Sequence, residues 1–191
     1  MVIENDLIQL KHNLNILPKS DVGHLTEKHL PVLLDIIKRT NPKKILEFGF
    51  NAGHSSMMWL TLTKAEVISA DPGSNHVWIG SNEVKDTFGR RFKFFNTSSQ
   101  DENFYLELIK IEFSPDLTFV DGDHSYDGCY KDLELAYKME SKYILVDNVE
   151  DGNLFNAIHD FVKDYPYEIL SIEEVKEYQQ KLALLGRIYE K

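Results

Sequence analysis

The sequence lacks the features that mark several large classes of protein. Cys129 is its only cysteine, so no disulfide can form within the chain and we expect a reducing compartment. The N-terminal segment MVIENDLIQLKHNLNIL carries charges every few residues and lacks the apolar core of a signal peptide, and no apolar run reaches the length of a membrane span. These absences favour a cytoplasmic protein with no membrane partner.

Basic residues are also scarce. The 191 residues include 21 Lys and Arg against 31 Asp and Glu, a formal net charge of −10. An acidic surface repels phosphate backbones, and the densest basic cluster, Arg90, Arg91 and Lys93, only flanks an apolar stretch. We therefore expect no nucleic-acid partner.

What is present is a regular alternation of short apolar runs and amphipathic helical stretches. The runs cover residues 43–48, 66–70, 91–95, 116–120, 143–146, 167–171 and 182–189. Short, nearly continuous apolar runs are typical of strands buried on both faces, and their alternation with helices indicates parallel crossovers. No long helix separates the last two runs. The sequence predicts an α/β, Rossmann-like, doubly wound sheet of seven strands, mostly parallel with an antiparallel closing strand, and helices on both faces.

Residues 1–25 form a predicted N-terminal helical extension ahead of a domain over residues 26–191. Ile3, Leu7, Leu10 and Leu14 share one helical face. We favour a helix that packs on the edge of the sheet; the alternative is a lid, or a contact between the two copies of a homodimer.

The sharpest local motif lies where the first strand turns into a helix, in Glu47-Phe48-Gly49-Phe50-Asn51-Ala52-Gly53-His54-Ser55. Gly49 and Gly53 let the backbone turn tightly and approach a ligand, and the following helix offers free N–H groups to a carboxylate. The G-x-x-x-G spacing differs from that of pyrophosphate-binding loops, and Glu47 would repel a phosphate but attract an ammonium group. A ligand with both an amino group and a carboxylate fits, as in the methionine part of S-adenosylmethionine. The alternative is a simple connecting loop.

The second strand ends in Ala70-Asp71-Pro72-Gly73. An acid at this position grips the ribose diol of nucleotide ligands in folds of this kind. Asp71 can equally open a turn before proline and glycine, and both roles can hold at once.

These motifs resemble the class I S-adenosylmethionine-dependent methyltransferases. Within them the chain is similar to small metal-dependent O-methyltransferases of the catechol and caffeoyl-coenzyme A type, and to bacterial methyltransferases with a D-G-D-H-S-Y box, here residues 121–126. The resemblance spans residues 26–150. It implies that the cofactor site comprises Glu47, Gly49, Phe50, Asn51, Gly53, Ser55, Asp71, Pro72, Ser99, Gln100 and Asp121, with Ser99 and Gln100 at the adenine.

Carboxylates follow the fourth and fifth strands, at Asp121 and at Asp147-Asn148. Carboxyl ends of neighbouring parallel strands share one edge of a sheet, so these side chains are expected within reach of one ion. Two carboxylates and an amide oxygen suit Mg²⁺, Mn²⁺ or Ca²⁺, and the resemblance implies the same three ligands. The alternative for Asp147-Asn148 is a turn that ends the strand.

His124 lies three residues after Asp121, where catechol-type enzymes carry a lysine that acts as general base. Histidine departs from that pattern, but it accepts protons near neutral pH. The hypothesis is methyl transfer to a small hydroxylated acceptor, assisted by a divalent metal and His124. His12, His24, His29 and His159 are interpreted as structural.

Two other functions remain open. One is a non-catalytic module that binds S-adenosylmethionine and transfers nothing. The other is a dinucleotide-dependent oxidoreductase, which the missing third glycine and the charge of Glu47 disfavour.

Overall fold

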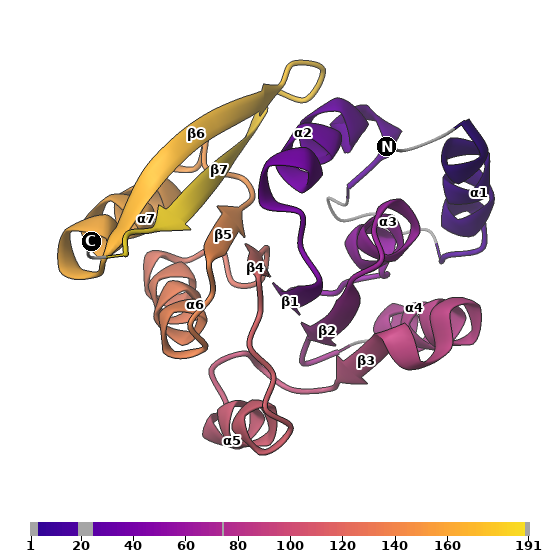
Figure 1. Ribbon diagram of the computed structural model, residues 1–191, viewed down its shortest axis with the longest axis horizontal. Coiled ribbons are helices and arrows are strands. Elements are labelled where there is room, and N and C mark those ends of the chain that lie inside the picture. Colours follow the sequence, from indigo (N-terminus) through magenta and orange to yellow (C-terminus); the bar gives the residue numbers. More distant parts are fainter. Residues whose placement is uncertain (1–3, 19–24, 74, 190–191) are drawn as a thin grey trace.

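The computed structural model describes residues 4–18, 25–73 and 75–189 (Figure 1). Its strands are β1 (Lys44–Phe48), β2 (Glu66–Ala70), β3 (Phe92–Phe95), β4 (Leu117–Val120), β5 (Tyr143–Val146), β6 (Tyr167–Val175) and β7 (Gln180–Arg187). Its α-helices are α1 (Glu4–Asn15), α2 (Leu30–Thr40), α3 (His54–Leu62), α4 (Asn75–Phe88), α5 (Glu102–Lys110), α6 (Tyr126–Lys138) and α7 (Gly152–Asp164). Two short 3₁₀ helices are η1 (Glu27–His29) and η2 (Gly89–Arg91).

The strands form one seven-stranded sheet in the order β3-β2-β1-β4-β5-β7-β6. β1 to β5 pair in parallel, and β7 is antiparallel to both of its neighbours, β5 and β6. The predicted fold class is therefore confirmed, including the antiparallel closing strand. The strand predicted over 167–171 continues to Val175, because alternating exposed and partly buried residues suit an edge strand with one face toward solvent.

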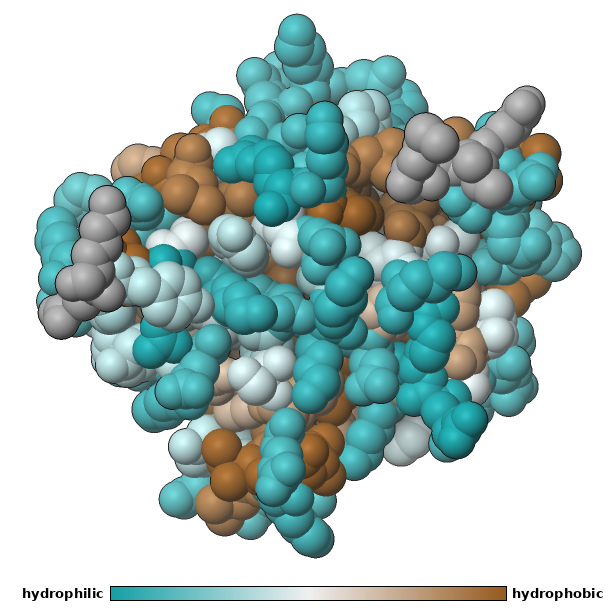
Figure 2. Space-filling model, viewed as in Figure 1, coloured by the Kyte–Doolittle hydropathy of each residue, from teal (hydrophilic) through white to brown (hydrophobic). Residues whose placement is uncertain are grey.

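Two hydrophobic cores lie on the two faces of the sheet, and Figure 1 shows helices on both sides of it. The surface seen from the same direction is largely hydrophilic, with exposed hydrophobic residues such as Leu106 and Ile109 over α5 (Figure 2). α1 to α4 supply residues such as Leu33, Met58 and Val77 to one core. α5 to α7 supply the other, with Phe104, Leu133 and Phe161 among its members. Neighbouring strand residues divide between them, Ile45 facing the first core and Leu46 the second, as the pleat of a strand requires.

α1 packs on α3, so it lies above a helix and not directly on the edge of the sheet. Leu10 is fully buried there, and the side-chain amide of Asn13 donates to Thr61 Oγ1 at 3.1 Å. Ile3 lies outside the described residues. The division into an extension and a main domain stays a prediction, although α1 contributes to the first core.

The parallel strands β1 to β5 all end at the same edge of the sheet, where open α/β folds bind ligands. The loops that follow them therefore lie together although they are far apart in sequence. Within the described residues, every helix is too short or too polar to cross a membrane.

Candidate active site

A cavity of about 970 Å³ lies at this edge of the sheet. Most of the predicted site residues line it: Gly49, Asn51, Asp71, Pro72, Ser99, Gln100, Asp121, His124, Asp147 and Asn148. The fold thus brings together five loops whose motifs extend over about 100 residues, from Gly49 to Asn148. Glu47, Phe50, Gly53 and Ser55 are not on its wall.

Gly49 is required by both its conformation and its surroundings. Its φ is +90°, a region that residues with a Cβ rarely adopt, and its N–H donates to the Ala70 carbonyl at 3.0 Å. A Cβ built on Gly49 would lie 1.9 Å from the Asp121 carbonyl oxygen. The loop after β1 therefore rests directly on the loop after β4, which leaves its outer side to the cavity.

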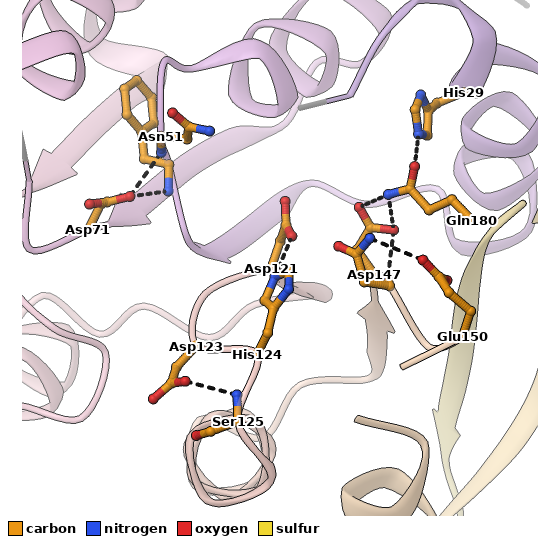
Figure 3. Close-up of polar contacts among 12 residues, drawn as sticks. His29, Asn51, Asp71, Asp121, Asp123, His124, Ser125, Asp147, Glu150 and Gln180 are labelled. Carbon is orange, nitrogen blue, oxygen red and sulfur yellow. Dashed lines mark hydrogen bonds and ion pairs between the residues drawn. The ribbon is translucent and has the colours of Figure 1, made fainter. Parts of the chain in front are cut away.

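Asp71 ties the loops after β1 and β2 together (Figure 3). Its Oδ2 accepts the backbone N–H groups of Phe50 at 3.0 Å and Asn51 at 2.9 Å, and its Oδ1 accepts that of Gly73 at 2.8 Å. Because a carboxylate oxygen has two lone pairs, Oδ1 can accept one more hydrogen bond. That position suits a ribose hydroxyl, so the predicted role of Asp71 and its role in the turn are compatible.

Glu47 lies beneath the glycine loop, fully buried on the α3 side of the sheet. Its Oε2 accepts hydrogen bonds from the hydroxyls of Ser56 and Ser69. Burial raises its pKa to about 7, and the serine hydroxyls, including that of Ser55, oppose the rise. In this arrangement Glu47 and Ser55 support the loop from below. Direct contact of either with a ligand stays a prediction.

Phe50 and Gly53 also shape the loop from within. The Phe50 ring is 1% exposed and packs against the rings of Phe92 and Phe94, while Gly53 caps α3 with φ +90°. Phe50 and Ser55 line a small recess beside the main cavity, next to Gly49 and Asn51. The side chains of Phe50 and Ser55 therefore lie away from the wall of the main cavity.

The loop after β3 brings Ser99 and Gln100 to the cavity. The resemblance to methyltransferases implies that these two residues contact the adenine. Ser99 donates to Asp132 Oδ1 at 2.5 Å. Asp132 is fully buried in α6 with no hydrogen-bond partner for Oδ2, and burial raises its pKa to about 7. This loop is therefore held from below by a buried acid.

Asp121 and His124 face each other across the turn after β4. His124 Nε2 lies 3.4 Å from Asp121 Oδ1, and the His124 side chain is half-exposed toward the cavity. Burial raises the pKa of Asp121, which His124 opposes, and the carboxylate of Asp121 raises the pKa of His124. With Nε2–H directed at Asp121, His124 Nδ1 is the nitrogen that can accept a proton. The neighbouring Ser125 caps α6 through its side chain, which accepts from the Gly128 N–H.

Asp147 is 3% exposed and is fully engaged on one oxygen. Its Oδ1 accepts from the backbone N–H of Asn148 at 2.8 Å and from Gln180 Nε2 at 2.9 Å, and Oδ2 accepts from Gln180 Nε2 at 2.8 Å. Burial, and then the charge of Asp121, raise the pKa of Asp147 well above its usual range. One buried acid and one partly buried acid that repel each other form a place where positive charge would be stabilised.

Four cavity residues that lie outside the loops after β1 to β5 were missed by the sequence interpretation: Thr26, His29, Tyr178 and Gln180. His29 was interpreted as structural, yet it is 1% exposed on the cavity wall and its Nε2 lies 2.7 Å from Gln180 Oε1. No motif marks these residues, because they come from η1 and from the β6–β7 hairpin, at opposite ends of the chain. Glu150, next to Asn148, adds a further acid to the wall.

Residues 46–148 match the model of a family described as a methyltransferase domain. This segment is more than half of the chain and contains the loops after β1, β2, β3, β4 and β5. The chain belongs to this methyltransferase-domain family. The recognition made from the glycine loop and the D-G-D-H-S-Y box is thereby confirmed, and the protein is an enzyme of the methyltransferase class.

Solved structures share the fold of this methyltransferase domain at low sequence identity. An O-methyltransferase from Bacillus cereus in complex with S-adenosylhomocysteine is 16% identical, with a TM-score of 0.65 over 98% of this chain and 93% of the other. A methyltransferase from Podospora anserina with S-adenosylhomocysteine bound is 17% identical, with a TM-score of 0.67 over 98% and 89%. No curated protein sequence matches the chain.

Proposed function

We propose that this methyltransferase domain binds S-adenosylmethionine and methylates a hydroxyl oxygen of a small acceptor, with a divalent cation at Asp121, Asp147 and Asn148 and with His124 as base. The observation that carries the proposal is the single cavity into which the glycine loop, Asp71 and the Asp121–His124 pair all open. The two structural relatives that hold S-adenosylhomocysteine support the choice of cofactor.

The residues at the carboxylate end fit a hard cation in their chemistry. Asp147 Oδ2 keeps one lone pair after its bond from Gln180, and Asn148 Oδ1 and the Asp121 carboxylate add oxygen donors. Among the described residues no group of three or more His, Cys, Asp or Glu side chains is arranged as a metal site. The proposed set therefore consists of two acids and one amide, with water completing the shell.

The chain's own residues handle the proton and the orientation. Bound S-adenosylmethionine would supply the methyl group, and a cation would lower the pKa of the acceptor hydroxyl. His124 Nδ1 accepts the hydroxyl proton while Asp121 holds the ring through Nε2–H. Because Asp121 raises the pKa of His124, the base is free at a pH above its usual range, and activity rises with pH through that region.

The cavity wall also limits the charge of the acceptor. Asp121, Asp123, Asp147 and Glu150 line it, and none of its described lining residues is Lys or Arg. An anionic group of the acceptor would therefore find no lysine or arginine side chain among the described lining residues to pair with, and would face four acids. The acceptor is thus a neutral or cationic hydroxyl compound, in contrast to a coenzyme A ester.

A screen of small hydroxylated compounds with labelled S-adenosylmethionine, with and without a chelator, tests this function. Compounds that share one dihydroxylated ring and differ only in an amine, a neutral or a carboxylate substituent read out the charge preference. We expect chelator-sensitive methylation of the amine and neutral members. Calorimetry should detect S-adenosylhomocysteine but not NAD.

Asp147→Ala should lower turnover at least about 100-fold, because the loss of one carboxylate weakens the cation site. The affinity for S-adenosylhomocysteine should stay within about threefold. Asp86→Ala, which removes an exposed acid of α4, is the matched control. Chelator-insensitive turnover by Asp147→Ala would rule out the metal role, and cofactor binding with no methylated product would identify a binding module.

A further inference from the structure

A chain of hydrogen bonds runs from η1 to the end of β5 through side chains that the proposed reaction does not use (Figure 3). The Thr26 backbone N–H donates to His29 Nδ1 at 3.0 Å. His29 Nε2 lies 2.7 Å from Gln180 Oε1, and Gln180 Nε2 donates to both oxygens of Asp147. Three segments far apart in sequence are thus joined at one acid.

The first contact fixes the direction of the others. A nitrogen that accepts a hydrogen bond carries no proton, so the neutral His29 ring bears its proton on Nε2. That N–H needs an acceptor, which Gln180 provides with Oε1. The amide nitrogen of Gln180 must then face Asp147. Reversing the amide would set two donors against each other at His29 and two acceptors against each other at Asp147.

The chain of hydrogen bonds ends at Asp147, so its order affects an acid of the proposed site. His29 and Asp147 are both almost fully buried, which strengthens the hydrogen bonds that they make. Asp147 follows β5 and Asp121 follows β4, and these are neighbouring parallel strands, so the last side chain of the chain of hydrogen bonds belongs to the proposed site. The amide of Gln180 donates to both oxygens of Asp147 and so fixes the plane of its carboxylate.

Contacts around the chain hold its two outer segments together. The His29 ring stacks on Tyr178 with centroids 5.5 Å apart, and the Tyr178 hydroxyl lies 3.3 Å from that of Thr26. An ion pair between Lys28 and Glu177 joins the same segments at the surface. These contacts join η1 to the β6–β7 hairpin.

We propose that His29 and Gln180 are positioning residues: His29 orients the Gln180 amide, and Gln180 holds the plane of the Asp147 carboxylate for the reaction. This inference rests on the proposed function for the role of Asp147, but the hydrogen-bonded chain can be tested without turnover.

The kinetic test uses Gln180→Leu, Gln180→Glu, His29→Leu and His29→Gln, with His159→Leu, an exposed histidine of α7, as control. We expect Gln180→Leu and His29→Leu to lower kcat about 10–100-fold, with acceptor KM changed less than about threefold and affinity for S-adenosylhomocysteine unchanged. Gln180→Glu should lose more, because an acceptor replaces both donors. His29→Gln, which keeps a donor, should recover part of the loss.

The double variant of His29→Leu and Gln180→Leu should have a kcat no lower than that of the more affected single variant, since both substitutions break the same chain of hydrogen bonds. Additive losses, or a full kcat in His29→Leu, would overturn the proposal. Thermal unfolding of each variant separates these effects from a loss of fold.

The test without turnover is nuclear magnetic resonance. ¹⁵N spectra of the wild-type protein should show His29 with its proton on Nε2. The ¹³Cγ resonance of Asp147 should shift in His29→Leu, although the two residues do not touch, and stay in place in His159→Leu. An Nδ1-protonated His29 or an unmoved Asp147 resonance would refute the chain even if methylation is confirmed, and the expected shifts would uphold it even if no acceptor is found.

Discussion

The two halves of the cavity are built by different means. On the half assigned to the cofactor, the loops after β1 and β2 present backbone N–H groups, glycines at φ +90°, and one carboxylate that ties the loops together. On the half around Asp147, segments from η1 and β7 meet through side chains alone. The first is a local device of consecutive residues, whereas the second depends on the closure of the whole sheet.

This difference predicts different tolerance to change. A surface made by backbone is insensitive to most side-chain replacements but has no room for added atoms where two segments touch. A surface made by side chains accepts replacements, each of which alters the shape or charge that an acceptor meets. The cofactor half is therefore suited to one constant ligand, and the other half to selection of the proposed acceptor.

The largest effect should come from adding one methyl group to the cofactor half. In Gly49→Ala the new Cβ meets the Asp121 carbonyl at 1.9 Å and the φ of +90° becomes strained, which should cost about 2–6 kcal/mol of unfolding free energy. S-adenosylhomocysteine binding should fall below detection in calorimetry. In Gly152→Ala at the start of α7, where a Cβ has nothing within 4 Å, both stability and binding should be retained. Equal behaviour of the two variants would contradict the tight contact.

A smaller effect of opposite sign is expected where a buried side chain does support the cofactor half. Asp132 has a pKa of about 7 in the folded protein against an ordinary value of 3.8, so its ionisation opposes folding above pH 7 and this cost fades as the pH falls toward 4. Asp132→Asn should thus stabilise the protein by about 2–4 kcal/mol at pH 8–9 and have little effect near pH 4. Chemical denaturation across this range measures it.

Asp123→Asn is the control for that prediction, because it removes an equal charge nearby. Its pKa is lowered by the Ser125 N–H, so its replacement should not stabilise the protein at high pH. A pH-independent gain in Asp132→Asn would mean that burial of its charge is not the cause.

The smallest effect is expected on the side-chain half. Tyr178→Phe removes a hydroxyl that lies 3.3 Å from the Thr26 hydroxyl at the rim of the cavity. Acceptor KM should change less than about tenfold, and cofactor affinity should not change. Tyr189→Phe, on an exposed tyrosine after β7, serves as the reference in the same steady-state assay. A loss of cofactor affinity in Tyr178→Phe would show that the two halves are not separate.

Much of this division is visible in the sequence. The strands alternate clearly with helices, and Gly49, Asp71, Asp121 and Asp147 each directly follow a strand, so parallel topology alone predicts that they meet. The sequence also predicts the orientation of the Glu47 side chain. Glu47 and Ile45 are two residues apart in a strand, so their side chains point to the same face of the sheet. The charge of Glu47 predicts contact with a ligand, whereas its position in the strand predicts burial against the first core.

The half around Gln180 was not predictable in this way. The partners His29 and Gln180 are separated by 151 positions, and neither lies in a motif or at the end of a parallel strand. Their meeting depends on the order of the last strands and on the register of the β6–β7 hairpin, which apolar patterning leaves undetermined. An isolated histidine and an isolated glutamine carry no signal of their own.

The position of β7 has a consequence for how the protein is made. Although β7 follows β6 in the chain, it occupies the slot between β5 and β6. During synthesis, the loops that carry the motifs are translated before β7. β5 therefore lacks its antiparallel neighbour until β7 has been made and has brought Gln180 to Asp147. A polypeptide that ends before β7 can thus contain every sequence motif and still be inactive. The onset of activity would report that β7 has joined the sheet.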